Sequence, residues 1–429
     1  MLSVSTALAR LQDGLGESFP DSPGTRIIDI AFPLNDAFDP LLWCGQQPQW
    51  PQFYWQQRNG DEELAALGAV KTFSSLDAAN RFLCQTGRQD LRIGGLNAFE
   101  PQQGSLVLPR LEWRRCGGRA VLRLVLHSDI SLREDAATAR AFLASLTTTQ
   151  ATPGAIPPLL SERHSSDYSQ WQAMIARATK AISAGEMDKV VLARATDLQF
   201  AAPLDAVSIM AASRRSNLNC FHFLMAFNAR QAFFGSTPER LWRRRGALLR
   251  TEALAGTVAN HQEDAKAQQL ADWLMKDDKN QRENMLVVED ICQRLQSEAS
   301  TLDVLPPQVV RLRKVQHLRR CIWTELAAPD DSRCLLQLQP TAAVAGLPRR
   351  AALAFIQRHE PFAREWYAGS AGYLSLAQSE FCVALRSAKV DHDTLRLYAG
   401  AGIVSGSDAQ QEWQEIDNKA AGLRSLLCP

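Results

Sequence analysis

Alternating apolar and polar residues dominate the first 150 positions of the chain and predict a β-sheet. Strands are predicted at residues 52–57, 64–70, 104–116 and 119–127, and helices at residues 76–85 and 136–146 after a short amphipathic amino-terminal helix. Residues 1–150 hold no cluster of His, Cys or closely spaced acids. This half is therefore predicted to be mostly a scaffold sheet without chemistry of its own.

Helical periodicity becomes more frequent after residues 147–158, TTTQATPGAIPP, a stretch rich in Thr, Pro and Gly that is the best linker candidate. An amphipathic helix is predicted from Trp171 to Ile182, with Gly185 placed to cap its end. The next strand starts at Lys189 and continues as an apolar run. A lysine at the mouth of a strand is usually a solvated edge residue. Partial burial, which would lower the lysine pKa, would instead suit a general base.

The middle of the chain predicts a strand pair at residues 221–227 and 232–235, followed by Glu239 in a Ser/Thr-rich turn. Residues 251–257 end a strand in a small-residue turn whose amides could meet an anion. Helices are predicted at residues 261–275 and 279–296, and Glu283 lies in the first turn of the second one, beside apolar residues.

In the carboxyl-terminal part, the residue pattern predicts a loop of small residues at 339–346 and then a helix extending to about residue 366. Three strands follow, at residues 367–375, 380–389 and 395–401. Arg386 falls on the face of the second strand that is lined by Cys and Ala. An arginine among close-packed small residues is expected to need a carboxylate partner from the protein or a ligand.

A last helix is predicted from the Ser407 and Gln410 pair, which has the spacing of a capping box. Its buried stripe is Trp413, Ile416, Ala420, Leu423 and Leu427. Glu412 and Glu415 share one face, with Lys419 a further turn along. Taken alone, this pattern is most simply a solvated acidic face, and a cation between the two carboxylates is the alternative.

Composition narrows the class of protein. The formal net charge of +1 over 429 residues gives no sign of a nucleic-acid partner. Nine cysteines without CxxC or CxxH spacing, and only seven histidines, predict neither a disulfide framework nor a zinc site. No apolar run has the length needed to span a membrane, so a cytoplasmic protein is expected. The AGAG stretch at residues 399–402 lacks the third glycine of a dinucleotide fold, which disfavours nucleotide cofactors.

The ordered set of these motifs resembles the chorismate-utilising enzymes, a family that includes isochorismate, anthranilate, aminodeoxychorismate and salicylate synthases. The set comprises Lys189, Ser236-x-Pro238-Glu239, Ala255-Gly256-Thr257, Lys279-x-x-x-Glu283, Pro340-Thr341, Ala371-Gly372-Tyr373, Ala384-Leu385-Arg386, Gly400-x-Gly402 and Glu412-x-x-Glu415. Longer segments, among them FYWQQRNGDEE and QEWQEIDNKAAGL, resemble the isochorismate synthases of menaquinone biosynthesis. The family fold implies one α+β domain over residues 1–429, with two large antiparallel sheets packed together, helices outside, and the catalytic motifs in residues 160–429.

The resemblance implies a Mg²⁺-dependent reaction on chorismate, in which water adds at C2 as the C4 hydroxyl departs. Lys189 matches the base, Glu239 the acid, and Glu283 and Glu415 the metal ligands, with Glu412 behind them. The positions that match substrate-binding residues are Gly256, Thr257, Thr341, Tyr367, Arg386, Gly400, Gly402 and Lys419.

The position of Lys189 holds glutamine in the ammonia-using members of the family, so water is the expected nucleophile. Asn280 stands where some relatives carry an acid, which makes the surroundings of the metal less negative. Two alternatives stay open: a salicylate synthase, which also eliminates pyruvate, and a non-catalytic chorismate-binding regulator. A monomer or weak homodimer is expected.

Overall fold

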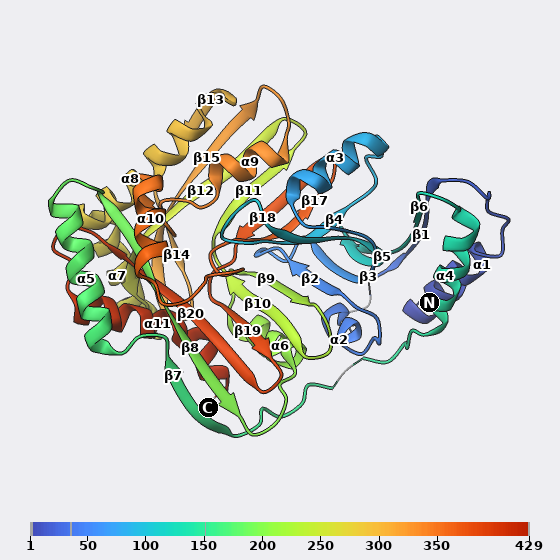
Figure 1. The fold of residues 1–429 in the computed structure, drawn as a ribbon, viewed down its shortest axis with the longest axis horizontal. Coiled ribbons are helices and arrows are strands. Elements are labelled where there is room, and N and C mark those ends of the chain that lie inside the picture. The colour runs from blue at the N-terminus through green and yellow to red at the C-terminus, as the bar shows by residue number, and fades with distance from the viewer. Residues whose placement is uncertain (1–2, 35–36, 151, 428–429) are drawn as a thin grey trace.

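Antiparallel strand pairing runs through the whole molecule, which is described here from a computed structural model over residues 3–34, 37–150 and 152–427 (Figure 1). Within those residues every strand pair is antiparallel. The pairings divide at β5 (Gly104–Cys116), which has β3 on one edge and β4 on the other, both of them opposite Leu106 and Val107. Two sheets therefore share one strand.

The first sheet continues from β5 through β3 (Glu63–Phe73), β2 (Gln52–Gln56), β9 (Phe221–Ala226), β10 (Gln231–Thr237), β19 (Ser387–Asp391), β20 (Thr394–Ile403) and β8 (Lys189–Phe200), with β7 (Leu159–His164) and β16 (Gly346–Leu347) beside β8. The second continues through β4 (Ile93–Asn97), β17 (Ser370–Leu374), β18 (Gln378–Val383), β11 (Arg240–Arg245), β12 (Leu248–Ala259) and β15 (Val315–Leu326), with β13 (Ala299–Val304) and β14 (Gln308–Arg311) beside β15. β6 (Arg119–Ser128) pairs with the last residues of β5 on the same edge as β4, opposite β3, and β1 (Gly24–Pro33) pairs with β6.

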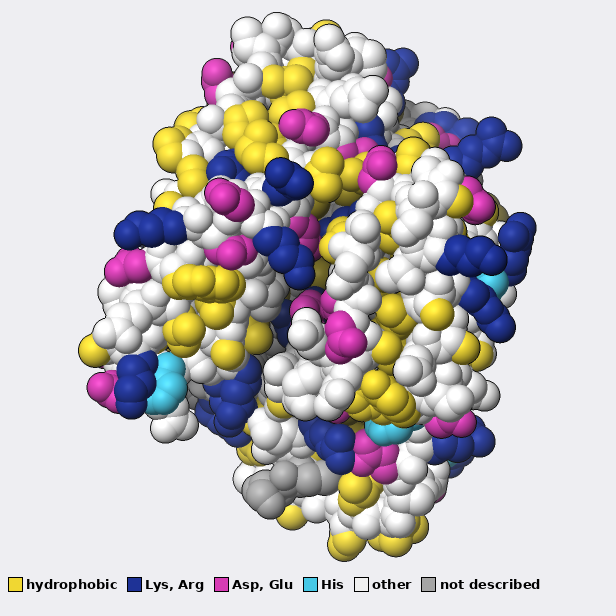
Figure 2. Space-filling model, turned by 90° about the vertical axis from the view of Figure 1, so that its left-hand side faces the viewer, with side chains coloured by type: hydrophobic (Ala, Val, Ile, Leu, Met, Phe, Trp, Pro, Cys, Tyr) yellow, Lys and Arg dark blue, Asp and Glu magenta, His cyan; other side chains and the backbone are white. Residues whose placement is uncertain are grey.

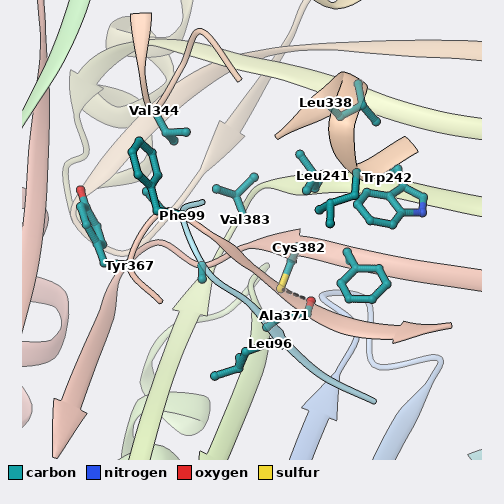
Figure 3. Close-up of a cluster of buried hydrophobic side chains, with 14 of the residues drawn as sticks. Leu96, Phe99, Leu241, Trp242, Leu338, Val344, Tyr367, Ala371, Cys382 and Val383 are labelled. Atoms are coloured by element: carbon teal, nitrogen blue, oxygen red, sulfur yellow. Dashed lines mark hydrogen bonds between the residues drawn. The ribbon is translucent and has the colours of Figure 1, made fainter. Parts of the chain in front are cut away.

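Alternation along the strands sorts side chains between two hydrophobic clusters. On β2, Phe53 and Trp55 belong to the cluster between the sheets, whereas Tyr54 belongs to the cluster on the outer face of the first sheet. Figure 3 shows part of the inner cluster, where Trp242 from β11 lies near Leu338 and Cys382 from β18 lies beside Ala371. The Cys382 thiol donates to the Ala371 carbonyl at 3.3 Å.

Helices cover the outer faces of both sheets. The outer cluster of the first sheet includes residues of α1 (Val4–Gly14), α2 (Pro40–Gly45), α4 (Leu132–Ala144) and α6 (Ala206–Ser216). The inner cluster continues through both faces of the second sheet, since the adjacent β18 residues Phe381 and Cys382 both belong to it. From there it extends into α3 (Leu76–Thr86), α5 (Tyr168–Ser183), α8 (Asp278–Leu295), α9 (Asp331–Leu338) and α10 (Arg349–His359). α7 (Asp264–Lys276) packs on β12, and α11 (Ala409–Leu427) on β20. This arrangement confirms the α+β fold with two antiparallel sheets and helices outside.

The two halves of the chain share both sheets. β2 from the amino-terminal half pairs with β9, and β4 pairs with β17. The linker candidate runs between α4 and β7 without helix or strand in its described residues, and the Thr147 carbonyl accepts the Trp43 indole N–H at 3.0 Å. No helix in the described ranges is long and apolar enough to cross a membrane.

Several local predictions were wrong. The helix expected to reach residue 366 ends at His359, because Pro361 disfavours helical geometry at the residue before it. The strand expected at residues 380–389 is two strands, β18 and β19, separated by a turn in which Arg386 has φ +49°. α11 is capped by Asp408, which accepts the N–H groups of Gln410 and Gln411 at 3.0 Å each; the Ser407 hydroxyl accepts the Val404 N–H instead.

Candidate active site

A cleft of about 810 Å³ brings together every predicted site residue except Thr341. Its walls come from the ends of β8, β12 and β20 and from α7, α8 and α11. Viewed from the side of α5, α7 and α11, the surface is hollowed, and basic and acidic side chains lie side by side at the hollow (Figure 2).

Lys189 and Glu283 form an ion pair inside this cleft. Lys189 is the first residue of β8 and is only 1% exposed, and its Nζ donates to Glu283 Oε1 at 2.8 Å. Burial alone would raise the pKa of Glu283, but the charge and hydrogen bond of Lys189 outweigh it and leave that pKa lowered. A Cβ on Gly402 would lie 3.0 Å from Lys189 Cε and 3.4 Å from Glu283 Oε1. Glycine at this position therefore leaves the pair its space.

Glu239 is a buried carboxyl that keeps its proton at neutral pH. It lies between β10 and β11, is 2% exposed and lines the cleft. Burial, then the negative charge of Glu252, raises its pKa from 4.5 to about 8, although Lys189, Arg386 and Lys419 act in the opposite direction. A carboxyl in this state can donate a proton near pH 7.

Helix α11 brings two further acids to the cleft. Glu415 Oε1 lies 2.5 Å from Lys419 Nζ, which also donates to the Gly400 carbonyl at 3.0 Å. Burial and then the charge of Glu415 raise the pKa of Glu412 to about 7. The charge of Glu415 therefore disfavours ionisation of Glu412, as their spacing on the helix predicts.

The carboxylates fit a hard divalent cation. Glu283 from α8 and Glu415 from α11 line one cleft, and each is held by a lysine. After burial, the charge of Glu415 is the second cause of the raised pKa of Glu412, and a cation would reduce that repulsion. Among the described residues, no three His, Cys, Asp or Glu side chains gather around one point. Two carboxylates suffice for Mg²⁺, which prefers oxygen ligands and retains several waters.

Arg386 points into the cleft from the turn between β18 and β19. Its Nη1 donates to the Lys419 carbonyl at 3.1 Å, and its Nη2 lies 3.2 Å from His317 Nε2. These partners are a carbonyl and a ring nitrogen, so the carboxylate expected beside Arg386 is not its hydrogen-bond partner within the described chain. Burial lowers the pKa of Arg386, and the negative charge of Glu415 acts in the opposite direction.

His317 on β15 is a cleft residue that sequence reasoning missed. Burial, together with the charges of Arg386 and Lys419, lowers the pKa of His317 well below 6.5, so the ring is neutral. A guanidinium can only donate, so Nε2 is the acceptor and Nδ1 carries the proton. The Nδ1–H then donates to Thr257 Oγ1 at 2.9 Å, which turns the Thr257 hydroxyl proton toward another acceptor.

The Gly256–Thr257 turn is a bulge in β12. The pairing with β15 shifts register between Leu254 and Thr257, and Gly256 has φ +86°, a conformation that favours glycine. The Thr257 N–H donates to Asn280 Oδ1 at 3.0 Å. The Thr257 N–H, one of the amides expected to face an anion, is therefore already bonded to Asn280. The side-chain hydroxyl of Thr257 remains as a donor to a ligand.

Tyr367 stacks on Tyr398 with ring centroids 5.1 Å apart and an interplanar angle of 8°. Burial raises the pKa of Tyr367 to about 12, so its hydroxyl stays a donor. A Cβ on Gly400 would lie 2.9 Å from that hydroxyl oxygen. Glycine at position 400 therefore leaves the hydroxyl accessible from the cleft.

Thr341 lies behind the cleft wall. It is buried, and its carbonyl accepts the N–H groups of Val344 and Ala345. Ala343 and Val344 line the cleft in its place.

Comparison with known proteins places this site in a family. A family model described as chorismate binding enzyme matches residues 96–428. The chain is 66% identical over 428 residues to the isochorismate synthase MenF of Escherichia coli (strain K12), covering 100% of this chain and 99% of that protein. It is 40% identical over 393 residues to MenF of Haemophilus influenzae, covering 91% of this chain and 90% of that one.

The solved structures agree with the sequence relationship. The menaquinone-specific isochorismate synthase MenF from Escherichia coli superposes with a TM-score of 0.97 at 66% identity, over 99% of this chain and 100% of that chain. Anthranilate synthase component I from Streptococcus pneumoniae shares the fold, with a TM-score of 0.64 at 20% identity over 98% and 97% of the two chains. The chain with this cleft belongs to the chorismate-binding enzyme family.

Proposed function

We propose that this protein is an isochorismate synthase of menaquinone biosynthesis, an isomerase that converts chorismate to isochorismate by adding water at C2 and releasing the C4 hydroxyl. The observation that carries the proposal is that a candidate proton donor and a candidate proton acceptor line the same cleft. Glu239 is a buried carboxyl with a pKa of about 8, and Lys189 is a buried amine facing the same space. The full-length identity to isochorismate synthases supports this choice within the family.

Lys189 is the proposed general base. In its neutral form the Nζ takes a proton from water as the oxygen of that water bonds to C2. The absence of a side chain at Gly402, next to Nζ, leaves room there for a small nucleophile. Glu239 is the proposed general acid, and it gives its proton to the C4 oxygen as the C4–O bond breaks. As the water oxygen bonds to C2, the C1=C2 double bond becomes C1=C6 and the C5=C6 double bond becomes C4=C5, which breaks the C4–O bond. One water is therefore consumed and one released. Each proton transfer of this kind typically contributes about 10²–10⁴-fold in rate.

The carboxylates of chorismate have several proposed partners in the cleft. Arg386 supplies guanidinium N–H groups, and Tyr367 supplies a phenol that stays protonated. The Thr257 hydroxyl, whose oxygen is held by His317, and the ammonium of Lys419 are further donors. Backbone N–H groups at Gly256, Gly400 and Gly402 complete the proposed set.

Glu283 and Glu415 are the proposed Mg²⁺ ligands, with Glu412 behind them. Bound there, the ion would supply positive charge for the ring carboxylate of the substrate. The two lysines on these carboxylates, Lys189 and Lys419, hold the acidic groups in place in the ion-free protein.

Incubation of the protein with chorismate and Mg²⁺, followed by separation of the products, tests the proposal. Isochorismate without salicylate or pyruvate is the expected result. Stoichiometric release of pyruvate would instead indicate a salicylate synthase, and absence of turnover with intact chorismate binding would indicate a regulator. Glu239→Gln should abolish turnover, while Lys71→Ala, which alters a surface pair with Asp129, serves as the matched control. A cytoplasmic location and a monomer or weak homodimer stay predictions from the sequence.

A further inference from the structure

A buried ion pair, Arg58 with Glu252, lies beside the turn that carries Glu239. Arg58 follows β2 in the amino-terminal half, which contributes none of the predicted site residues. Its Nη1 and Nη2 donate to the two carboxylate oxygens of Glu252 at 2.6 and 2.8 Å. The side chains are 9% and 0% exposed. Removing two charges from water is costly, and a buried pair is weak evidence for a stabilising role.

The same two side chains also hold the backbone on both sides of Glu239. Arg58 Nη1 donates to the Pro238 carbonyl at 2.9 Å, and Glu252 Oε1 accepts the Arg240 N–H at 2.8 Å. The Glu239 carbonyl itself accepts the Val383 N–H at 3.0 Å. The residues before and after Glu239 are therefore fixed to one ion pair.

The charged groups near Glu239 have opposing effects on its protonation. Four charged groups act on this carboxyl: Glu252 from β12, Lys189 from β8, Arg386 from the turn after β18, and Lys419 from α11. After burial, Glu252 makes the largest contribution, and of the four it alone favours the protonated form. Without that negative charge, three cations would favour the carboxylate.

We propose that Arg58 and Glu252 are positioning residues for the acid of the reaction, fixing the Glu239 turn in the cleft and using the Glu252 charge to keep that acid protonated. This inference rests on the proposed function of Glu239. It gives the amino-terminal half a part in the chemistry, through an arginine within the segment FYWQQRNGDEE.

A second buried pair provides a matched control. Arg244 and Asp331 are joined at 2.6 and 2.9 Å, with side chains 3% and 1% exposed. Neither residue lines the cleft. A merely structural role for Arg58 and Glu252 would make the two pairs behave alike.

The test is the pH dependence of chorismate conversion, measured as kcat/KM from about pH 6 to about pH 9.5 on the full chain with Mg²⁺. The parent activity should fall as pH rises past about 8. Glu252→Gln should move this alkaline limb to lower pH by about one pH unit or more. In the double variant Arg58→Gln/Glu252→Gln the limb should lie between those of the parent and the single variant, because both charges are gone. Asp331→Asn should leave the limb where it is in the parent.

The outcomes distinguish a failure of the proposed function from a failure of the positioning role. A parent protein without turnover would overturn the proposed function. A parent that turns over, together with a folded Glu252→Gln variant that loses rate equally at every pH, would overturn the positioning role alone. Circular dichroism establishes folding, and if the single variant does not fold, the double variant is judged by the same criterion of a moved or unmoved limb.

Discussion

Replacing Glu239 by glutamine should stabilise the protein at alkaline pH while it abolishes turnover. The carboxyl is 2% exposed, and burial with the Glu252 charge raises its pKa from 4.5 to about 8. Between those two pH values the unfolded chain releases this proton and the folded chain keeps it. The contribution of this carboxyl to the free energy of unfolding is therefore complete only below that pH range, and it is lost as pH rises through the range.

The size of the effect follows from the width of the window. Each pH unit of difference between the folded and unfolded pKa is worth about 1.4 kcal/mol, so this one group costs up to about 5 kcal/mol by pH 8. Glutamine has nearly the same shape and does not titrate. The free energy of unfolding of Glu239→Gln minus that of the parent should be small near pH 4.5 and should grow by a few kcal/mol toward pH 8.

Urea denaturation at several pH values and constant ionic strength measures this difference. Glu186→Gln, a change at an exposed glutamate just before β8, is the control and should follow the parent at every pH. The turnover of the parent should fall over the same alkaline range in which Glu239 loses its proton. Parallel stability profiles for Glu239→Gln and the parent would refute the reasoning, because they would mean that the carboxyl titrates equally in the folded and unfolded chains.

Three further predictions concern the base, the metal and the space between them. Lys189→Ala should leave chorismate binding near the parent value by calorimetry but lower kcat by about 10²-fold or more, and a near-normal kcat would exclude its role as base. Glu415→Ala should weaken Mg²⁺ and chorismate binding together, so an unchanged dependence of rate on Mg²⁺ concentration would contradict its role as a ligand. Gly402→Ala would place a Cβ 3.0 Å from Lys189 Cε and should lower kcat with little change in melting temperature; full activity would show that the Lys189–Glu283 pair has room to move.

Strands with clear alternation could be predicted from the sequence, and β4, with two adjacent glycines, could not. The predicted strands near residues 221–227 and 104–116 appear as β9 and β5. β4 was missed because Gly94 and Gly95 resemble a turn. A Cβ on Gly95 would lie 2.1 Å from the Ser105 carbonyl oxygen, so these glycines serve close contact between strands, a tertiary requirement that local pattern does not contain.

Site residues could be predicted where they match a family motif. Contacts between residues far apart in the sequence could not. Glu283 and Glu415 were paired only through the resemblance, since more than a hundred residues separate them in the sequence. The contacts of Arg386 depend on a left-handed turn that strand alternation does not encode. His317 gave no signal, because a single histidine in a strand of mixed polar and apolar residues belongs to no motif.

The sharing of both sheets by the two halves limits how the chain can be divided. A fragment that kept only the half with the catalytic motifs would lose β2 and β4, which cover the edges of β9 and β17. Every residue of β9 and of β17 is buried in the intact protein. The fragment would expose two long rows of unpaired backbone groups flanked by apolar side chains, the combination that leads strands to join copies of themselves. We therefore expect a fragment of residues 160–429 alone to aggregate more readily than the intact chain.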